Sequence, residues 1–90
     1  MLIIPKRHVA NCFDLNSSEV CAMHEMLVEM KKTIETKDDS VTAFNIGVNA
    51  GEDAGQTIFH VHVHLIPRRK GDVENPRGGV RGVIPKKRNY

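Results

Sequence analysis

The fold is decided by one stretch of the chain, Gly55-Gln56-Thr57-Ile58-Phe59-His60-Val61-His62-Val63-His64-Leu65-Ile66-Pro67. Its histidines alternate with apolar residues, and side chains alternate between the two faces of a β-strand. The pattern predicts a strand, ended by Pro67 and a basic cluster, with three imidazoles on one face about 7 Å apart. The imidazoles are those of His60, His62 and His64, and the apolar face consists of Val61, Val63 and Leu65.

The histidine face admits three interpretations, of which the first two explain it poorly. A core that needed only polar spacers would not use one titratable residue type three times in five positions. A His-x-His pair on a strand can place two nitrogens on one zinc ion, but the third histidine lies too far along a straight strand. The chain contains no Cys-x-x-Cys or His-Glu-x-x-His motif, so we expect no metal at these histidines.

The third interpretation is nucleophilic catalysis at phosphorus. An imidazole is a competent nucleophile when a neighbouring group holds the correct tautomer, and flanking histidines can bind charge or pass protons. Just before the histidines, residues 49–57 form a glycine-rich turn whose backbone amides can approach a phosphate closely. The two features together favour a phosphate or acyl-phosphate site.

These motifs resemble those of the histidine triad (HIT) family of nucleotide hydrolases and transferases. Residues 60–66 match the family motif His-φ-His-φ-His-φ-φ, where φ is apolar. The similarity extends over residues 44–51, 54–57 and 66–68, and the tail at residues 71–85 resembles that of the bacterial branch.

The resemblance implies a covalent mechanism. The middle histidine, His62, would attack the α-phosphorus of a nucleotide and form a nucleotidyl-histidine that water then hydrolyses. The carbonyl of His60 would orient that ring. Transferases of the family carry Gln where this chain has His64, so His64 favours hydrolysis of nucleoside phosphoramidates, adenylates or dinucleoside polyphosphates. The covalent step would require no cofactor, although a polyphosphate substrate can arrive as a magnesium complex.

The implied site residues fall into two groups. Those implied to be catalytic are His60, His62, His64 and Thr57, the last acting with the turn amides as an oxyanion site. Those implied to bind substrate are Asn45, Asn49, Gly55 and Gln56.

The resemblance covers nearly the whole chain but not the start of the family domain. Residues 2–4 predict a short strand closed by Pro5, and in the family this strand follows a helix and a hairpin that supply the base and ribose pocket. We therefore expect an α+β fold of the HIT type, N-terminally truncated, with an antiparallel sheet, one long helix and an extended C-terminal tail. A catalytically silent nucleotide-binding or interaction module is the alternative. Exposed strand edges would favour a homodimer.

The helix is predicted over residues 17–37. Asn16 and Glu19 have the spacing of a capping box. Apolar residues then recur at steps of three and four, as in a helix that buries one face. That stripe consists of Val20, Met23, Leu27, Met30 and Ile34, and Met26 is also expected in the core.

A second strand is predicted over residues 41–49. Phe44, Ile46 and Val48 would share one face, and Asn45 and Asn49 the other. The glycine turn that follows would return the chain antiparallel to the histidine strand, so these asparagines would border the histidine face.

The 90 residues predict a single domain, with a core at 1–67 and a basic Gly/Pro-rich tail at 68–90. The tail has eight Lys and Arg against two acidic residues, a charge of +6, whereas residues 1–67 carry −4. Such a tail suits an anionic ligand or a solvated surface, and we expect no specific nucleic-acid partner.

The location of the protein is predicted from its thiols and its hydropathy. Cys12 and Cys21 do not form a disulfide framework or a zinc knuckle, so reduced thiols are expected. No apolar run is long enough for a signal peptide or a membrane span. We therefore expect a soluble cytoplasmic protein.

Overall fold

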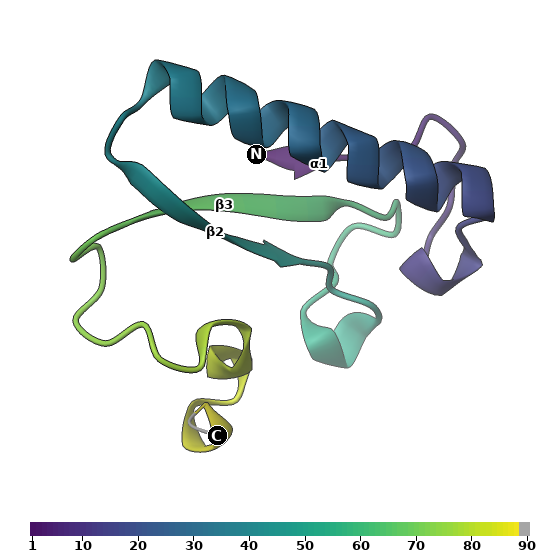
Figure 1. Ribbon diagram of the computed structural model, residues 1–90. Helices are drawn as coiled ribbons and strands as arrows, with labels where there is room; N and C mark the ends of the chain where they lie inside the picture. The colour runs from purple at the N-terminus through teal and green to yellow at the C-terminus, as the bar shows by residue number, and fades with distance from the viewer. Residues whose placement is uncertain (89–90) are drawn as a thin grey trace.

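The computed structural model describes residues 1–88 and contains one long helix packed on a three-stranded antiparallel sheet with the strand order β1-β3-β2 (Figure 1). This arrangement confirms the predicted α+β class. The regular elements are β1 (Leu2–Ile3), α1 (Ser17–Lys37), β2 (Val41–Gly47) and β3 (Val63–Arg69). Four short 3₁₀ turns connect them or follow them, namely η1 (Cys12–Asp14), η2 (Glu52–Ala54), η3 (Gly79–Val83) and η4 (Pro85–Lys87).

α1 has the predicted bounds because its N-terminus is encoded locally. The Glu19 N–H donates to the Asn16 side chain at 2.8 Å, and the Asn16 N–H donates to the Glu19 carboxylate at 3.0 Å. This reciprocal pair satisfies two of the amides that every helix start leaves without a partner.

The core lies between α1 and the apolar face of the sheet. Val61, Val63 and Leu65 are 1%, 3% and 1% exposed, so the predicted alternation of the histidine stretch is confirmed. Leu27 completes the buried cluster, and Ile3, Met23, Met30, Ile34, Phe44 and Val48 pack around it. The prediction of a core position was wrong for Val20 and Met26, which are 45% and 42% exposed. Met26 lines an open groove between α1 and residues 3–7, so part of its surface stays in contact with solvent.

The bounds of β3 differ from the prediction at both ends. The strand starts at Val63 because β1 pairs only with residues 63 and 64 and β2 ends at Gly47, opposite His64. His60 and His62 therefore lie just before the strand. Pro67 does not end it but pairs with Phe44 inside it. A proline is tolerated there because β1 does not reach that side of β3. The strand continues to Arg69 and so crosses the predicted boundary between core and tail.

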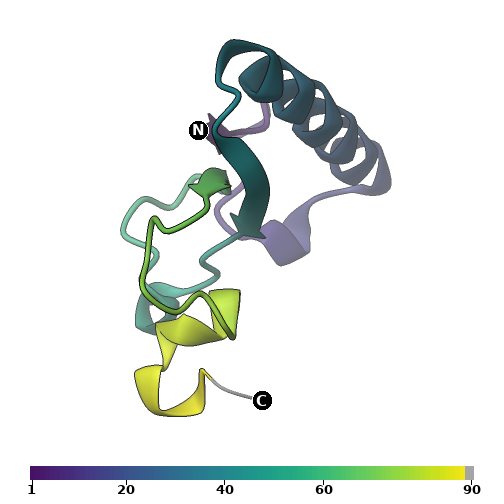
Figure 2. The ribbon, with the colours of Figure 1, turned by 60° about the vertical axis from the view of Figure 1, so that its left-hand side comes forward.

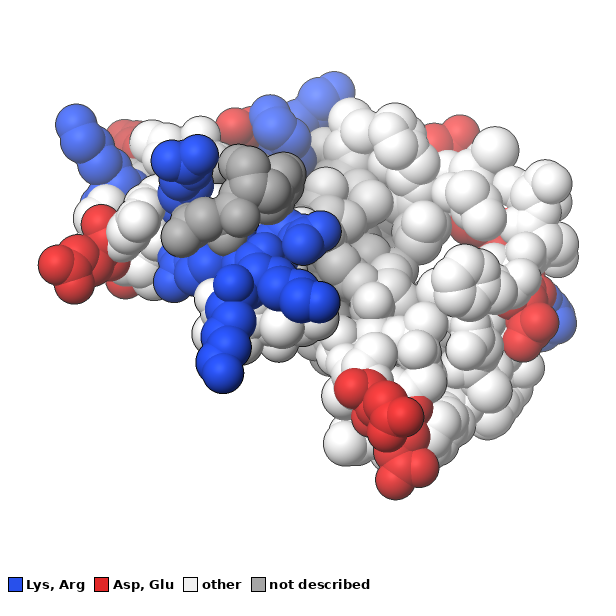
Figure 3. Space-filling model, turned by 90° about the horizontal axis from the view of Figure 1, so that it is seen from below, with Lys and Arg blue, Asp and Glu red and all other residues white. Residues whose placement is uncertain are grey.

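The tail is folded into turns rather than extended, and it lies on the side of the sheet away from α1 (Figures 1 and 2). It closes on itself, since the Arg88 guanidinium donates to the carbonyls of Asn75 and Arg77. Gly78, at φ +89°, is required at this closure because a Cβ atom there would lie 1.8 Å from the Arg88 carbonyl oxygen. Figure 3 shows Lys and Arg side chains gathered on this underside of the molecule.

An ion pair fastens the end of β3 to the end of α1. The Asp38 carboxylate accepts from Arg69 Nη2 at 2.7 Å and from the Ser40 N–H at 2.9 Å. The Arg69 guanidinium first, and then Ser40, lower the pKa of Asp38 from 3.8 to about 2. Stabilisation by such a carboxylate is complete above its unfolded pKa and is lost as the pH falls through its folded pKa.

We therefore expect the Asp38→Asn variant to lose part of the parent's pH dependence of stability between about pH 4 and pH 2. Urea unfolding midpoints measured across this range test the prediction. Asp39→Asn changes the same chemical group one residue away, outside these contacts, and should keep the parent's slope. Parallel curves for the parent and Asp38→Asn would contradict it.

Candidate active site

The three histidines lie together at the start of β3, all partly buried. His62 and His64 have ring centroids 5.1 Å apart at an interplanar angle of 70°. Gly47 lies opposite His64 in the sheet register, and a Cβ atom built on Gly47 would meet nothing within 4 Å. The strand partner therefore leaves open space beside the His64 ring.

Hydrogen bonds define the tautomers of the first two histidines. His60 Nε2 lies 3.1 Å from the Pro5 carbonyl oxygen, and His62 Nδ1 lies 3.2 Å from the His60 carbonyl oxygen. A carbonyl oxygen can only accept, so His60 Nε2 and His62 Nδ1 both carry protons. In the neutral ring His62 Nε2 therefore holds the lone pair, and it makes no hydrogen bond within residues 1–88. The contact from the His60 carbonyl to the middle ring is the one that the family resemblance implies.

The glycine-rich turn is closed by its own amides. Gly51 and Gly55 have φ values of +99° and +92°, which glycine adopts without strain. The Gly55 N–H donates to the Glu52 carbonyl at 2.9 Å, and the Gln56 N–H donates to the Gly51 carbonyl at 3.1 Å. These two amides are thus engaged within the turn, contrary to the oxyanion role expected of them. The Thr57 N–H has no such bond in the described part of the chain, and the Thr57 side chain is exposed.

Gln56, predicted to bind substrate, lies inside the structure with 2% of its surface exposed. Its side chain accepts from the Gly51 N–H at 2.9 Å and donates to the carbonyls of Ala10 and Ile58 at 2.6 and 3.1 Å. A buried amide with its donors and acceptor used in this way holds backbone segments together. The side chain is therefore an internal bridge.

The two asparagines have different surroundings. Asn49 lies beside the turn, with its Nδ2 3.8 Å from the position of a Cβ on Gly55, so the structure brings these two predicted residues together. Asn45 instead accepts from Arg68 Nη1 at 2.5 Å and lies under Gly79 of the tail. Arg68 also pairs with Asp72 at 2.8 Å and holds the pKa of that carboxyl well below its usual range. Asn45 thus bonds to the end of β3 and lies against the tail.

Sequence reasoning missed the segment that supports the histidines. The carbonyls of Pro5, Val9 and Ala10 all accept hydrogen bonds from residues 56–61. Backbone acceptors carry no sequence signature. His8, in the same segment, is exposed and stacks on the His60 ring with centroids 5.0 Å apart.

The described part of the chain contains neither a cluster of metal ligands nor a membrane-spanning helix. Among residues 1–88, no group of three or more His, Cys, Asp or Glu side chains is placed to hold a metal ion. None of the helices in that range has both the length and the apolar character needed to cross a bilayer.

A long helix on an antiparallel sheet, with a middle histidine held by the carbonyl of the first, defines a histidine triad domain. The family model described as the HIT domain matches residues 1–71, and the chain belongs to this family.

Known relatives and solved structures agree with this assignment. The chain is 46% identical over 72 residues to the bis(5'-nucleosyl)-tetraphosphatase [asymmetrical] of Schizosaccharomyces pombe, covering 80% of this chain and 39% of that protein. It is 35% identical to the bis(5'-adenosyl)-triphosphatase of Dictyostelium discoideum, covering 83% and 50%. The NitFhit structure from C. elegans aligns with a TM-score of 0.73 and 36% identity over 93% of this chain and 20% of that one. The chain thus spans half or less of the length of these proteins.

Proposed function

We propose that the chain is a nucleotide hydrolase that acts on nucleoside phosphoramidates, adenylates or dinucleoside polyphosphates through a covalent nucleotidyl-histidine. The observation that carries the proposal is the hydrogen bond from His62 Nδ1 to the His60 carbonyl oxygen, because it directs the lone pair to His62 Nε2. The similarity to the tetraphosphatase of S. pombe and the triphosphatase of D. discoideum supports dinucleoside polyphosphates as a substrate class.

The proposed reaction forms the nucleotidyl-histidine in one step and hydrolyses it in a second. His62 Nε2 donates its lone pair to the α-phosphorus, a P–N bond forms, and the bond from phosphorus to the leaving group breaks. The leaving group keeps the electron pair of that bond and takes a proton from solvent. Water then attacks the same phosphorus and gives up a proton to solvent, the electron pair of the P–N bond returns to His62 Nε2, and the nucleoside monophosphate leaves with neutral His62 restored. In this proposal His64, whose ring lies beside that of His62, binds phosphate oxygens. Thr57 and Asn49 lie at the turn that faces the phosphate in this scheme.

The activity is tested by incubating the chain with adenosine phosphoramidate or a diadenosine polyphosphate and measuring nucleotide release by chromatography. We expect AMP release from the phosphoramidate that persists in EDTA, because the covalent step uses no metal. Binding without release would instead favour the silent nucleotide-binding module.

A cytoplasmic location is part of the proposal, supported by the free thiols of Cys12 and Cys21.

We also propose that the chain forms a homodimer through β2. This strand is an edge of the sheet, seven residues long and without a charged side chain. Natural edge strands that remain single are usually protected by charge or proline. Beside it lies a groove of about 370 Å³ between α1 and β2, bordered by Val28 and Ile46, which are 41% and 50% exposed. Antiparallel pairing of β2 with β2 of a second copy, around a two-fold axis, would satisfy the strand edge and bury the groove.

Light scattering at about micromolar concentration is therefore expected to give the mass of a dimer. Ile46→Lys should reduce the mass to that of a monomer, because it places a charge in the closed groove. Leu2→Lys changes an apolar residue of similar exposure, 57%, on β1 at the opposite edge of the sheet, and should leave the dimer intact. A monomeric mass for the parent chain would refute the proposal.

A further inference from the structure

We propose that Arg7 and Glu19 are positioning residues for the reactive histidine: their ion pair clamps the segment at residues 5–10 to the start of α1, and this segment aims the His60 carbonyl at His62. The inference rests on the proposed function for its kinetic consequence, although its structural consequence can be measured separately.

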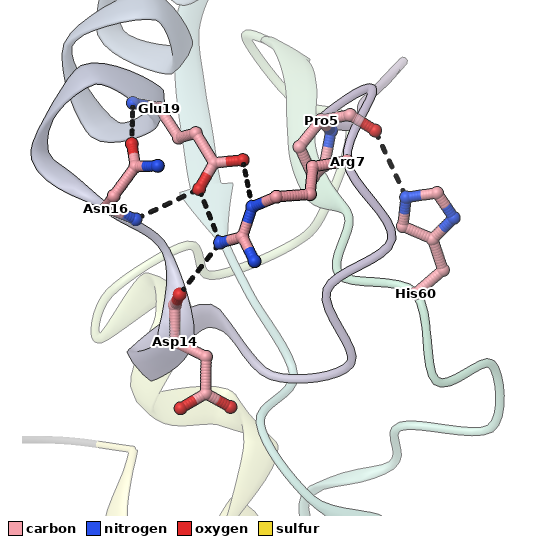
Figure 4. A network of polar contacts seen from close by, with 6 residues as sticks. All are labelled: Pro5, Arg7, Asp14, Asn16, Glu19 and His60. Carbon is pink, nitrogen blue, oxygen red and sulfur yellow. Dashed lines mark hydrogen bonds and ion pairs between the residues drawn. The ribbon is translucent and has the colours of Figure 1, made fainter.

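The clamp is a bidentate ion pair with a third contact. Arg7 Nη2 and Nε lie 2.8 and 3.1 Å from the two Glu19 carboxylate oxygens, and Nη2 also donates to the Asp14 carbonyl at 3.1 Å (Figure 4). The Glu19 carboxylate, 17% exposed, is itself fixed by the capping box with Asn16. Arg7, then the Asn16 N–H, lower the pKa of Glu19, so the carboxylate stays charged. The helix start thus provides a rigid anchor.

The clamped segment has no regular secondary structure to hold it. β1 ends at Ile3 and η1 begins at Cys12, so residues 5–10 belong to no helix or strand. Arg7 lies in the middle of this segment, and the Val9 side chain is buried, with 4% of its surface exposed.

The same segment supports the histidines through its carbonyl groups. The Pro5 carbonyl accepts from His60 Nε2 at 3.1 Å, and the Val9 carbonyl accepts from the Val61 N–H at 2.7 Å. The Val61 N–H and the His60 C=O belong to one planar trans peptide unit and point in opposite directions. Holding the N–H on Val9 therefore turns the His60 carbonyl towards His62 Nδ1, where it accepts the bond of 3.2 Å that fixes the tautomer.

The test measures the His62 tautomer by ¹⁵N NMR at about pH 8.5, roughly two units above the ordinary imidazole pKa. For Arg7→Ala we expect the ratio of the Nδ1–H to the Nε2–H form of His62 to fall about two- to tenfold, the change that one weakened hydrogen bond produces. The value of kcat should fall by a similar factor with little change in KM.

Two further variants separate positioning from stability. Glu19→Gln keeps an oxygen for the Asn16 N–H but removes the charge that holds Arg7, so it should shift the tautomer in the same direction with the helix cap retained. Arg69→Ala removes an ion pair of similar length, 2.7 Å, at the far end of α1. It should lower the melting temperature without changing the tautomer ratio.

The outcomes are distinct. A tautomer ratio that stays at the parent value in both Arg7→Ala and Glu19→Gln would overturn the inference, whether or not the chain hydrolyses nucleotides. A shifted ratio in a chain that shows no hydrolysis would support the inference and refute the proposed function alone. An equal shift in Arg69→Ala would also overturn it, because the effect would then follow stability in general.

Discussion

His62→Ala is expected to abolish the covalent nucleotide adduct and to lower kcat by about a thousandfold or more, the scale on which loss of a nucleophile acts. The reason is geometric: His62 Nε2 is the ring nitrogen left with a lone pair by the bond between His62 Nδ1 and the His60 carbonyl. Incubation with an adenosine phosphoramidate labelled in the adenosine, followed by acid quench and mass spectrometry, measures the adduct directly.

Two controls define what this result means. His24→Ala removes an imidazole from the exposed surface of α1 and should label like the parent. His64→Gln keeps the nucleophile and should still form the adduct, at a lower rate, because it changes a contact to phosphate oxygens. If His62→Ala forms as much adduct as the parent, another residue is the nucleophile.

Leu65→Ala is expected to lower the free energy of unfolding by about 2–5 kcal/mol, as deletion of a fully buried leucine usually does. Leu65 is 1% exposed and packs with Leu27 and Val63 in the central cluster. In a chain of this size such a loss is a large fraction of the total stability.

The neighbouring residue provides a matched control on the opposite face of the strand. Ile66 is 47% exposed and pairs with Asn45. Ile66→Ala should cost less than about 1 kcal/mol, as is usual for a half-exposed position. Urea unfolding of both variants is the measurement. Similar losses at the two positions would mean that the apolar face of β3 is not the one assigned.

Local signals in the sequence predicted the helix and the two faces of the histidine stretch. Asn16 and Glu19 define the start of α1 by contacts within three residues, so no tertiary information was needed. The burial of Val61 and Leu65 follows from their alternation with histidine, a property of any strand with one buried face.

The features that were not predicted depend on contacts between distant segments. β3 begins at Val63 because β1 is only two residues long, which the sequence of β3 itself cannot reveal. Gln56 is an internal bridge because residue 10 passes beside it. The pairing of Arg7 with Glu19 likewise depends on how the chain turns between them. The sequence shows that these side chains are polar, but the fold determines which group each one bonds to.

The closure of the tail by Gly78 and Arg88 has a dynamic consequence. None of residues 70–88 is buried, and η3 packs on β2 and the neighbouring turn η4. Segments with so little buried surface open at a lower free energy than the core, as separate cooperative units. Amide exchange should therefore be fast in the tail and slow in β3. On warming, the basic tail should detach from the sheet while the three histidines keep their arrangement.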